Sequence, residues 1–548
     1  MRGEVLDDAK TLEAYSRDAS LFKVTPQAVV RPVDAADVCS LVRYVAAQKA
    51  QDHKLDLHIT PRAAGTDMSG GPLTTSIVLD TVAHLNKFIA LEGDEATVEP
   101  GMYFRDFDKE TKKKGLELPS YTASRELNTV GGMVGNNSGG EKNLKYGKTA
   151  RYAEELEVVL ADGQVHTLKN LAGGELAQKL KEPGYEGEVY RQVAALLTNP
   201  AYAKVIDASK PKVEKNSSGY ALWDIGNGRD SLNLARLMVG SQGTLGIVTK
   251  IKFKLVKPKP YASMAVIFVN NLAQLGELVP EVLRYQPDSF ESYDDHTFSI
   301  AIKYLPELAA QMKSGLVGIG LSFLPELWMA LTGGIPKLIL LVEFRGDTQE
   351  EALAQANRLA AEVAHNKSHV SVRVAQTEAK ARKYWAVRRE SFNLLRKKIR
   401  GKRTAPFIDD FVVPPAVLPE FLPKLQGLMS QYPQLTYTVA GHVGDGNFHI
   451  IPLIDPKDPT IGKVINELSH QVYDLVLSYQ GSISGEHNDG LVRTPYVEKM
   501  FGREMYALFL EIKKIFDPYD IFNPGKKVGL TYSQALSKLD LPGAPGRP

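Results

Sequence analysis

Two histidines lie at the ends of a short turn in the stretch Gly441-His-Val-Gly-Asp-Gly-Asn-Phe-His449. Asp445-Gly446 is a favoured two-residue hairpin turn, which would place His442 directly opposite His449. Opposed residues on one face of a hairpin have Cβ atoms about 5 Å apart, so these two imidazoles could share one divalent metal. The same pattern also fits a hairpin whose histidines bind no ligand.

A carboxylate and a third imidazole follow in Gly485-Glu-His-Asn-Asp-Gly490. Adjacent residues on an extended chain point to opposite sides, so Glu486 could complete a two-histidine, one-carboxylate metal site while His487 faces another group. A Lewis-acidic metal lowers the pKa of a chelated hydroxyl, and a histidine can accept the released proton near neutral pH. These residue types therefore fit proton removal from a metal-bound hydroxyl.

Two adjacent arginines in Tyr384-Trp-Ala-Val-Arg-Arg-Glu390 stand near the start of a predicted helix. A carboxylate prefers a bidentate cation, which a guanidinium supplies. Arg388 is therefore a candidate for binding an anionic substrate. The alternative is a solvated basic face of the helix.

Two glycine-rich stretches precede these residues. Pro61-Arg-Ala-Ala-Gly-Thr-Asp-Met-Ser-Gly-Gly71 lies between the predicted strands Leu55–Thr60 and Ser76–Asp80, and can turn several backbone N–H groups toward an anion such as a pyrophosphate. It is neither a Walker loop nor a Gly-x-Gly-x-x-Gly motif. In the second, predicted loop, Val130-Gly-Gly-Met-Val-Gly-Asn-Asn-Ser-Gly-Gly140, followed by Tyr146-Gly147, the backbone must pass close to something flat and polar.

Together with Gly240-Ser-Gln-Gly-Thr-Leu-Gly-Ile-Val-Thr249, these stretches resemble the FAD-binding half of the vanillyl-alcohol oxidase / p-cresol methylhydroxylase (PCMH) flavoproteins. Gln242 stands where that family often has Glu. With Phe516-Asp-Pro-Tyr-Asp-Ile-Phe-Asn-Pro-Gly-Lys526, which is similar to the family's C-terminal signature, the resemblance covers nearly the whole chain. The closest branch resembles the D-lactate and D-2-hydroxyglutarate dehydrogenases.

The resemblance implies an α+β fold with a two-subdomain PCMH-type FAD-binding domain, a second α+β substrate (cap) domain, and a C-terminal segment that returns to the flavin. We predict an N-terminal helical extension at 1–21, the FAD-binding domain at 22–257 with an insertion at about 170–235, the substrate domain with the metal site at 258–515, and the flavin-contacting segment with a loose tail at 516–548.

The resemblance also implies the residues of the site. Those that match His442, His449 and Glu486 bind a metal, usually zinc, and the one that matches His487 is the catalytic base. Arg388 matches the arginine that holds the substrate carboxylate. The implied FAD-binding residues are Pro61, Arg62, Ala63, Ala64, Gly65, Thr66, Asp67, Ser69, Gly70, Pro119, Gly131, Gly132, Gly135, Asn136, Asn137, Gly139, Gly140, Tyr146, Gly147, Gly243, Gly246, Ile247, Val248 and Asn523. The FAD loops lack a His or Cys that matches the family's covalent attachment points, so FAD should be non-covalent.

The implied reaction is a metal-assisted oxidation of a D-2-hydroxy acid to the 2-oxo acid. The hydride passes to flavin N5, and the electrons pass to a quinone, a cytochrome or a separate electron-transfer protein. In hydroxyglutarate-specific relatives a Thr and a Lys hold the distal carboxylate. Phe392 and approximately Ile408 occupy those places here, which favours a D-lactate-like substrate.

Three alternatives stay open. The first is a dehydrogenase of D-2-hydroxyglutarate or glycolate. The second is a flavin-dependent transferase resembling alkylglycerone-phosphate synthase, in which no net oxidation occurs. The third is a non-catalytic FAD subunit that transfers electrons within a larger complex. The paired histidines and the Gly-Glu-His sequence favour a dehydrogenase.

Composition limits the classes of partner and metal site that the chain can have. The chain has 548 residues, enough for two or three domains, and its 43% hydrophobic and 24% charged residues are typical of a folded soluble protein. A net charge of +2 without a basic block gives no sign of a nucleic-acid partner. Cys39 is the only cysteine, which excludes intramolecular disulfides, cysteine zinc sites and iron–sulfur clusters within the chain. The first residues lack the apolar run of a signal peptide, so a cytoplasmic location is expected.

The most apolar stretch is Gly315–Ile335, with a single charge at Glu326. Its length approaches a membrane span, but Pro325, Glu326 and Gly333-Gly334 interrupt it. It fits either a buried loop and helix or a surface segment that inserts Trp328 and its apolar neighbours into a membrane interface. Our hypothesis is reversible, peripheral membrane contact through residues 320–332, at the inner face of the membrane, where electrons could pass to a quinone.

Overall fold

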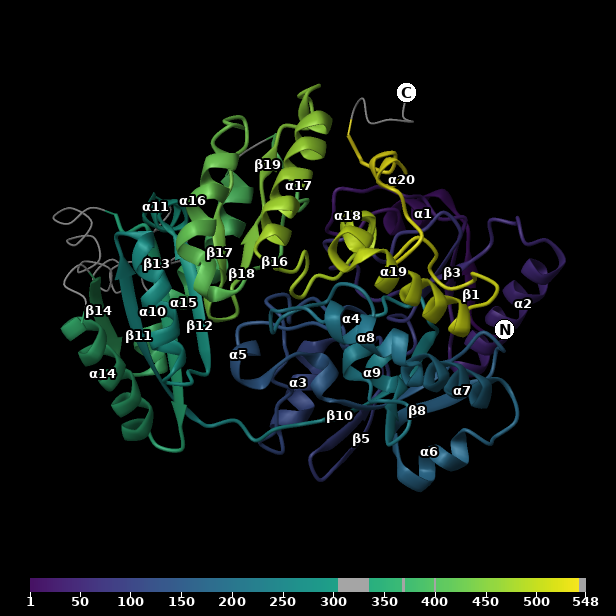
Figure 1. Cartoon of the computed structure of the whole chain (residues 1–548). Helices are drawn as coiled ribbons and strands as arrows, with labels where there is room; N and C mark the ends of the chain where they lie inside the picture. Colours follow the sequence, from purple (N-terminus) through teal and green to yellow (C-terminus); the bar gives the residue numbers. More distant parts are fainter. Residues whose placement is uncertain (304–334, 367–369, 399–400, 542–548) are drawn as a thin grey trace.

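The computed structural model describes residues 1–303, 335–366, 370–398 and 401–541, without the side chains of 300–303, 366 and 390–398. Within these residues the strands form a four-stranded, a six-stranded, a seven-stranded and a two-stranded sheet. The seven-stranded sheet and its helices form one side of the molecule, and the four- and six-stranded sheets lie on the opposite side (Figure 1). The mixture of helices and sheets agrees with the predicted α+β class.

The first sheet has the strand order β1-β2-β4-β3. Its elements are β1 (Glu4–Leu6), α1 (Ala9–Tyr15), β2 (Ala28–Arg31), α2 (Ala35–Gln51), β3 (Ile59–Arg62) and β4 (Ile77–Asp80). The Asp34 carboxylate begins α2 by accepting a hydrogen bond from the backbone N–H of Asp37 at 3.1 Å. Val38, Val42 and Val45 form the apolar face of α2 and are fully buried.

One of the two strands predicted in this region differs in extent. The strand predicted at Ser76–Asp80 is β4, which lies in the first sheet between β2 and β3. β4 is parallel to both neighbours, and α2 supplies the crossover between β2 and β3. The strand predicted at Leu55–Thr60 begins only at Ile59, and Leu55 is exposed.

The six-stranded sheet has the order β5-β6-β10-β7-β8-β9. Its strands are β5 (Phe88–Glu92), β6 (Glu95–Val98), β7 (Ala153–Val159), β8 (Val165–Ala172), β9 (Ser231–Asn233) and β10 (Ile247–Lys254). The surrounding helices are α3 (Phe104–Lys112), α4 (Val130–Asn136), α5 (Asn143–Tyr146), α6 (Gly173–Lys179), α7 (Tyr185–Thr198), α8 (Pro200–Ser209) and α9 (Leu234–Met238). Along β10, buried Ile247, Ile251 and Phe253 alternate with partly exposed lysines, as expected for a strand with one face on a core.

The second glycine-rich stretch, predicted to be a loop, forms helix α4 over its first seven residues. The Thr129 side chain caps this helix by accepting a hydrogen bond from the backbone N–H of Gly132 at 3.4 Å. The helix ends at Asn137, which has the left-handed conformation with φ of 49°. A Cβ at Gly131 would lie 2.6 Å from a backbone oxygen of Pro100, so glycine is required for close packing rather than for a loop.

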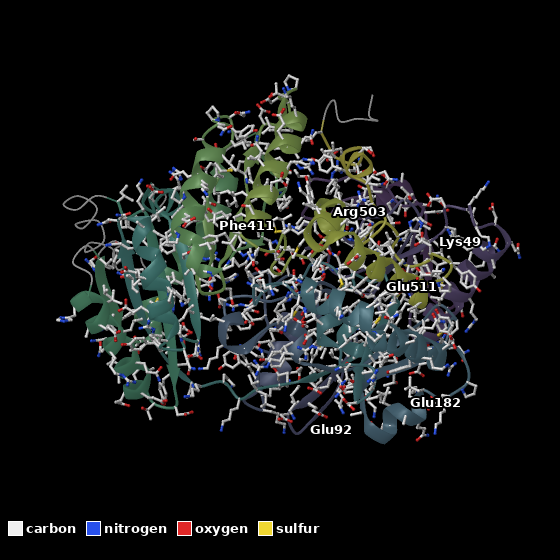
Figure 2. The ribbon with its side chains drawn as sticks, in the orientation of Figure 1. Lys49, Glu92, Glu182, Phe411, Arg503 and Glu511 are labelled. Atoms are coloured by element: carbon white, nitrogen blue, oxygen red, sulfur yellow. The ribbon has the colours of Figure 1, made fainter. Side chains whose placement is uncertain are left out.

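The seven-stranded sheet has the order β14-β11-β13-β12-β17-β18-β16. Its strands are β11 (Tyr261–Val269), β12 (Ser289–Asp294), β13 (Leu338–Gly346), β14 (Val370–Ala375), β16 (Phe411–Val412), β17 (Val439–His442) and β18 (Asn447–Ile450), and β15 (Arg403–Thr404) pairs with β19 (Leu453–Ile454). Its helices are α10 (Leu275–Leu283), α11 (Asp295–Lys303), α14 (Gln349–Asn366), α15 (Glu378–Lys398), α16 (Leu418–Met429) and α17 (Ile461–Ser478). Phe411 lies inside this part of the molecule, whereas Glu92 and Glu182 project from the lower edge of the opposite part (Figure 2).

The C-terminal segment, which was predicted to return to the flavin, contacts the first sheet. It contains α18 (Gly490–Arg493), α19 (Val497–Phe516) and α20 (Tyr532–Leu536), which lie over the N-terminal part of the chain (Figure 1). The backbone N–H of Ile59 in β3 donates to the carbonyl of Ile521 at 2.7 Å, and the N–H of Asn523 donates to the carbonyl of Ile59 at 2.9 Å. Helices α7 and α8, from the predicted insertion at 170–235, pack against α19.

Residues 304–334, and with them nearly all of the apolar stretch Gly315–Ile335, lie outside the described residues. The predictions of a buried segment or a membrane contact there stay predictions. In the described part of the chain, no helix is both long and apolar enough to cross a membrane.

Candidate active site

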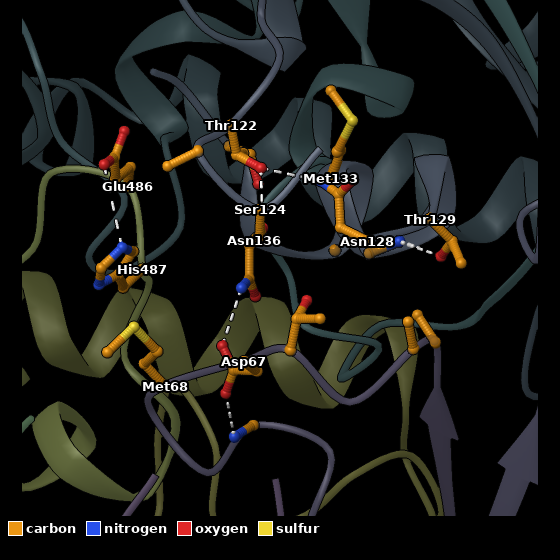
Figure 3. Close-up of a pocket in the computed structure, with 18 of the residues that line it drawn as sticks. Asp67, Met68, Thr122, Ser124, Asn128, Thr129, Met133, Asn136, Glu486 and His487 are labelled. Atoms are coloured by element: carbon orange, nitrogen blue, oxygen red, sulfur yellow. Dashed lines mark hydrogen bonds and ion pairs between the residues drawn. The ribbon is translucent and has the colours of Figure 1, made fainter. Parts of the chain in front are cut away.

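A cavity of about 380 Å³ brings the glycine-rich stretches and the histidine cluster together. The glycine-rich side comes from the end of β3, from α4 and from the start of β10, and the other side comes from α15, β17, β18 and the loop before α18. In Figure 3, Glu486 and His487 lie on one side, Asn128 and Thr129 lie on the other, and Thr122, Ser124, Asn136 and Asp67 lie between them. One cavity therefore contacts both predicted halves of the chain.

Most of the predicted FAD-binding residues line this cavity. They are Pro61, Arg62, Ala63, Ala64, Gly65, Thr66, Asp67, Gly131, Gly132, Gly135, Asn136, Gly140, Gly243, Gly246 and Val248. The predicted residues that are not part of its lining are Ser69, Gly70, Pro119, Asn137, Gly139, Tyr146, Gly147, Ile247 and Asn523. An ideal Cβ at Gly135 would meet nothing within 4 Å, so this helix face leaves open space along the cavity.

The first glycine-rich stretch is held by its own aspartate. The Asp67 Oδ2 atom accepts hydrogen bonds from the backbone N–H groups of Ser69 at 3.1 Å and Gly71 at 2.7 Å. Its Oδ1 atom accepts one from the Asn136 amide at 2.8 Å, which ties this stretch to α4 (Figure 3). The amides of Ser69 and Gly71 thus have a partner inside the protein, so other N–H groups of the stretch would have to hold the predicted anion.

Two predicted FAD-binding residues, Arg62 and Asn523, have side-chain partners within the protein. The Arg62 guanidinium donates to the carbonyls of Tyr15 at 3.1 Å and Arg17 at 2.7 Å, so it holds the N-terminal segment. Asn523 is 1% exposed, and its amide nitrogen donates to the carbonyls of Gly71 at 3.0 Å and Gln242 at 2.7 Å. Asn523 therefore joins the first and third glycine-rich stretches from behind the cavity.

The hairpin that carries the paired histidines differs from the predicted register. His442 pairs with Asn447, and Ala440 pairs with His449, because Val443–Asp445 form a 3-10 turn that Gly446 closes with φ of 69°. The loop is therefore two residues longer than the predicted two-residue turn. A shift of two residues leaves both histidines on the same face, since side chains alternate with a period of two. They are diagonal neighbours, with ring centroids 5.3 Å apart.

The three predicted metal ligands meet at one oxygen atom. The Oε1 atom of Glu486 lies 3.3 Å from Nε2 of His442 and 3.0 Å from Nε2 of His449. The Oε2 atom of the same carboxylate lies 3.0 Å from Nζ of Lys215, a fully buried side chain, in a contact without hydrogen-bond alignment. Two imidazole nitrogens and a carboxylate that converge in this way are a donor set that fits a divalent cation.

The other nitrogen of each imidazole faces a buried carboxylate. Nδ1 of His442 lies 2.6 Å from Glu291 Oε1, and Nδ1 of His449 lies 3.2 Å from Asp409 Oδ1. Nδ1 of His487 lies 2.7 Å from Asp409 Oδ2, an ion-pair contact without hydrogen-bond alignment. Carboxylates behind histidines are the usual support of a metal site, because they fix the tautomer and the ring orientation.

His487 does not face away from the other ligands, as the alternation of an extended chain predicted. Its ring stacks on His449 with centroids 5.1 Å apart, and its Nε2 lies 3.9 Å from Glu486 Oε1. The Asp410 carboxylate causes this arrangement, because it accepts hydrogen bonds from the backbone N–H groups of Glu486 at 2.9 Å and His487 at 2.7 Å and bends the chain there. Asp410, His449, Glu486 and His487 offer ligand atoms within 4.8 Å of one another.

The carboxylates and imidazoles of the cluster shift one another's pKa values. Burial lowers the pKa of His449, but Asp409 and Glu486 outweigh burial and raise it to about 10. Burial also lowers the pKa of His487, whereas Asp410 and Asp409 raise it above its ordinary value. Burial raises the pKa of Asp409, but His487 and His449 hold it below its ordinary range.

The adjacent arginines of α15 both line the cavity but have different partners. The Arg388 guanidinium lies 3.2 Å from Glu291 Oε2, so Glu291 contacts both Arg388 and His442. The buried Nε of Arg388 has no hydrogen-bond partner among the described residues. Arg389 donates to both oxygens of Glu141, at 3.1 and 2.6 Å. Arg388 is thus the arginine that shares a carboxylate partner with His442.

The two residues on which the substrate prediction rested are not part of the described cavity lining. Ile408 is fully buried in the hydrophobic core, so the assignment of Ile408 to the cavity wall was wrong. Phe392 lies in the part of α15 whose side chains are outside the described residues. The uncharged residues Thr438, Ala440 and Ile451 line the cavity on or beside the histidine hairpin instead.

Sequence reasoning missed the partners of the histidines. Glu291 lies on β12, 151 positions before His442, and no local pattern connects the two residues. The adjacent acids Asp409 and Asp410 were a usable signal, because two neighbouring carboxylates beside a buried strand need cationic partners. Lys215 falls in the segment that was interpreted as a polar insertion.

Comparison with known proteins agrees with this arrangement. Residues 26–169 match the FAD binding domain family, and residues 259–527 match the C-terminal domain of FAD linked oxidases. The chain is 30% identical to D-2-hydroxyglutarate dehydrogenase of Pseudomonas putida, over 96% of this chain and 50% of that protein, so it spans about half the length of that relative. It is 28% identical to D-lactate dehydrogenase of Archaeoglobus fulgidus, over 94% of this chain and 96% of that protein.

Among solved structures, p-cresol methylhydroxylase with bound substrate superposes with a TM-score of 0.65 at 17% identity, over 95% of this chain and 93% of that chain. This likeness shows the fold. The chain belongs to the proteins that join an FAD binding domain to the C-terminal domain of FAD linked oxidases.

Proposed function

We propose that the protein oxidises a small D-2-hydroxy acid to the 2-oxo acid with non-covalent FAD and a divalent metal. The observation that supports this proposal is the single cavity that the glycine-rich stretches share with His442, His449, Glu486, His487 and Arg388. Relatives of nearly the same length, such as the D-lactate dehydrogenase above, favour this reaction.

In the proposed site, Nε2 of His442, Nε2 of His449 and Oε1 of Glu486 would hold the metal, for which zinc is the first candidate because its usual ligands include this set. A bound divalent cation supplies Lewis acidity, which lowers the pKa of a substrate hydroxyl. Glu291 and Asp409 keep the two imidazoles oriented, so that each presents Nε2 to the same point.

The chain's own groups would bind the substrate and move its proton. Arg388 would bind the substrate carboxylate, for which its Nε–H, without a hydrogen-bond partner in the described part of the chain, is available. Asp409 contacts Nδ1 of His487, which leaves Nε2 as the atom that accepts the hydroxyl proton. A divalent cation bound by Glu486 would oppose the raising of the His487 pKa by Asp410 and Asp409.

FAD, when bound, supplies the hydride acceptor. Residues of α4 would lie against it, since a side chain at Gly135 would enter the open cavity. Gly135→Leu should therefore abolish the flavin absorbance while the apoprotein keeps the thermal stability of wild type. Wild-type protein that stays colourless after FAD is added would contradict the proposed cofactor.

The decisive experiment is anaerobic mixing of the holoenzyme with D-lactate. A dehydrogenase bleaches the flavin and forms one pyruvate per FAD. A transferase or a non-catalytic electron-transfer subunit leaves the flavin oxidised and forms no pyruvate.

We propose a preference for D-lactate-like substrates over D-2-hydroxyglutarate. Thr438, Ala440 and Ile451 offer no charge to a second carboxylate, and an unpaired charge against such a wall costs several kcal/mol. The comparison of kcat/KM for the two acids tests this preference, and a higher value for D-2-hydroxyglutarate would contradict it.

We also propose that a quinone, a cytochrome or a separate electron-transfer protein accepts the electrons. We place the protein in the cytoplasm and propose that residues 320–332 make peripheral contact with the membrane. The apolar sequence of that segment supports the membrane contact. Trp328→Glu combined with Leu324→Glu should release the protein from liposomes without loss of flavin. Equal pelleting of wild type and double variant would contradict the contact.

A further inference from the structure

A second cavity, of about 550 Å³, adjoins the candidate active site. Helix α3, the loop that follows it and the chain around Tyr121 form one wall, and β13 and α15 form another. Glu141 and Arg389 line this cavity and also line the active-site cavity. The ion pair between these two residues therefore stands between the two cavities.

The charges of the second cavity favour anions. Nine Arg and Lys side chains line it, against six Asp and Glu side chains, among the described residues. On α3, Lys109 and Lys112 reach the cavity with side chains that are 69% and 61% exposed. A cleft lined mainly by one sign of charge raises the local concentration of the opposite ion and speeds its association.

The partition between the cavities is a carboxylate held by two guanidiniums. Arg389 contacts Glu141 at 2.6 Å and stacks over the Trp385 ring at 4.5 Å, and Arg125 lies 3.6 Å from the same carboxylate. An incoming carboxylate can replace Glu141 as the partner of these guanidiniums, because it offers the same bidentate geometry. Arg388, the next residue along α15, then lies on the active-site side.

We propose that the second cavity is an anion-binding vestibule through which small carboxylates reach the active site, and that the Glu141–Arg389 pair closes its inner end. A flavin along α4 and the first glycine-rich stretch would fill the opposite approach, which leaves this side for the substrate. This inference rests on the proposed function, because it takes the ligand to be a small carboxylate.

The test uses oxalate, a small dicarboxylate, as the probe of the FAD- and metal-loaded protein. Rapid mixing follows the flavin absorbance and gives the association rate constant at about 0.01 M and about 1 M salt, where the screening lengths are about 30 Å and 3 Å. The test variant is Lys109→Glu with Lys112→Glu. The matched control is Lys113→Glu, on the same end of α3, 66% exposed and ion-paired like the others, but not part of the lining.

The double variant should bind oxalate about tenfold more slowly than wild type at low salt and at nearly the wild-type rate at high salt. Lys113→Glu should change the rate less than twofold. Equal rates in the double variant and the control would overturn the vestibule, as would wild type that binds no oxalate.

A second variant tests the inner partition. Glu141→Gln should raise the association rate several-fold at both salt concentrations, because salt screens a partly buried pair, here 16% and 36% exposed, less than it screens the lysines of α3. Glu110→Gln, which removes a carboxylate of α3 that lines neither cavity, is its control. A Glu141→Gln variant with a normal flavin spectrum and an unchanged rate would overturn the partition.

These results are distinct from those that test the proposed function. A protein that oxidises D-lactate but shows no charge dependence would refute the vestibule alone. A protein that oxidises no 2-hydroxy acid but binds oxalate with the expected charge dependence would refute the proposed reaction alone.

Discussion

Replacement of Asp409 by asparagine tests the support of the histidine cluster. The fully buried Asp409 carboxylate contacts Nδ1 of His449 at 3.2 Å and Nδ1 of His487 at 2.7 Å. The amide has nearly the same shape, but it carries no charge, and only one of its two ends accepts a hydrogen bond. One imidazole must therefore lose its acceptor, and both lose a neighbouring negative charge.

The expected size of the effect follows from these contacts. A hydrogen bond to a charged group contributes about 1.5–3 kcal/mol, and loss of a carboxylate behind a metal-binding histidine weakens metal affinity or activity about 10–100-fold. Asp409→Asn should therefore raise the metal dissociation constant about 10–100-fold through His449. It should also slow flavin reduction by at least about tenfold at saturating metal through His487.

Competition with a chelator measures the first effect, and anaerobic stopped-flow absorbance with D-lactate measures the second. Asp455→Asn is the matched control, because Asp455 is an exposed carboxylate of the same part of the chain whose Oδ1 accepts a hydrogen bond from the backbone N–H of Lys457 at 2.9 Å. If Asp409→Asn matches this control in metal affinity and in the rate of flavin reduction, the assigned role of the carboxylate is wrong.

Three further predictions concern single histidines. His442→Ala should lose the metal and turnover but keep its flavin absorbance, since the glycine-rich stretches are untouched; metal analysis and spectroscopy check this. His487→Ala should slow flavin reduction about 10²–10⁴-fold in stopped-flow experiments, the usual contribution of a general base. Burial lowers the pKa of His166, but Asp162 and Glu186 raise it to about 9. This folded value lies above the unfolded value of about 6.5, so the stabilisation is full below pH 6.5 and disappears as the pH rises through 9. Urea unfolding should show His166→Gln less stable than wild type at pH 6 and nearly equal to it at pH 10.

The sequence predicted those parts of the site that depend on local patterns. His442, His449 and Glu486 converge even though the predicted hairpin register was off by two residues, because alternation keeps residues two apart on one face. Turn length was the error: Asp445-Gly446 fits a two-residue turn, but the chain adds a 3-10 turn from Val443.

Contacts between distant segments could not be predicted in the same way. Glu291 reaches His442 only because β12 pairs with β17, and the sequence carries no signal for that neighbour relation. Ile408 was placed in the cavity by analogy, but its side chain turns into the core. The glycines of α4 were interpreted as loop residues, because glycine is unfavourable in helices. The Thr129 cap and the close backbone packing at Gly131, which favour a helix here, are visible only in the structure.

The hydrogen bonds by which Asn523 joins the first and third glycine-rich stretches also determine when the FAD site can be completed during synthesis. Asn523 follows Gly71, whose carbonyl it binds, by 452 positions. At about 5–20 residues per second, a ribosome needs roughly 20–90 s to add that length. The glycine-rich stretches therefore leave the ribosome long before the side chain that joins them exists, and cofactor loading becomes a post-translational step. A fragment of residues 1–515 should accordingly fail to retain FAD on a desalting column that leaves the full chain yellow.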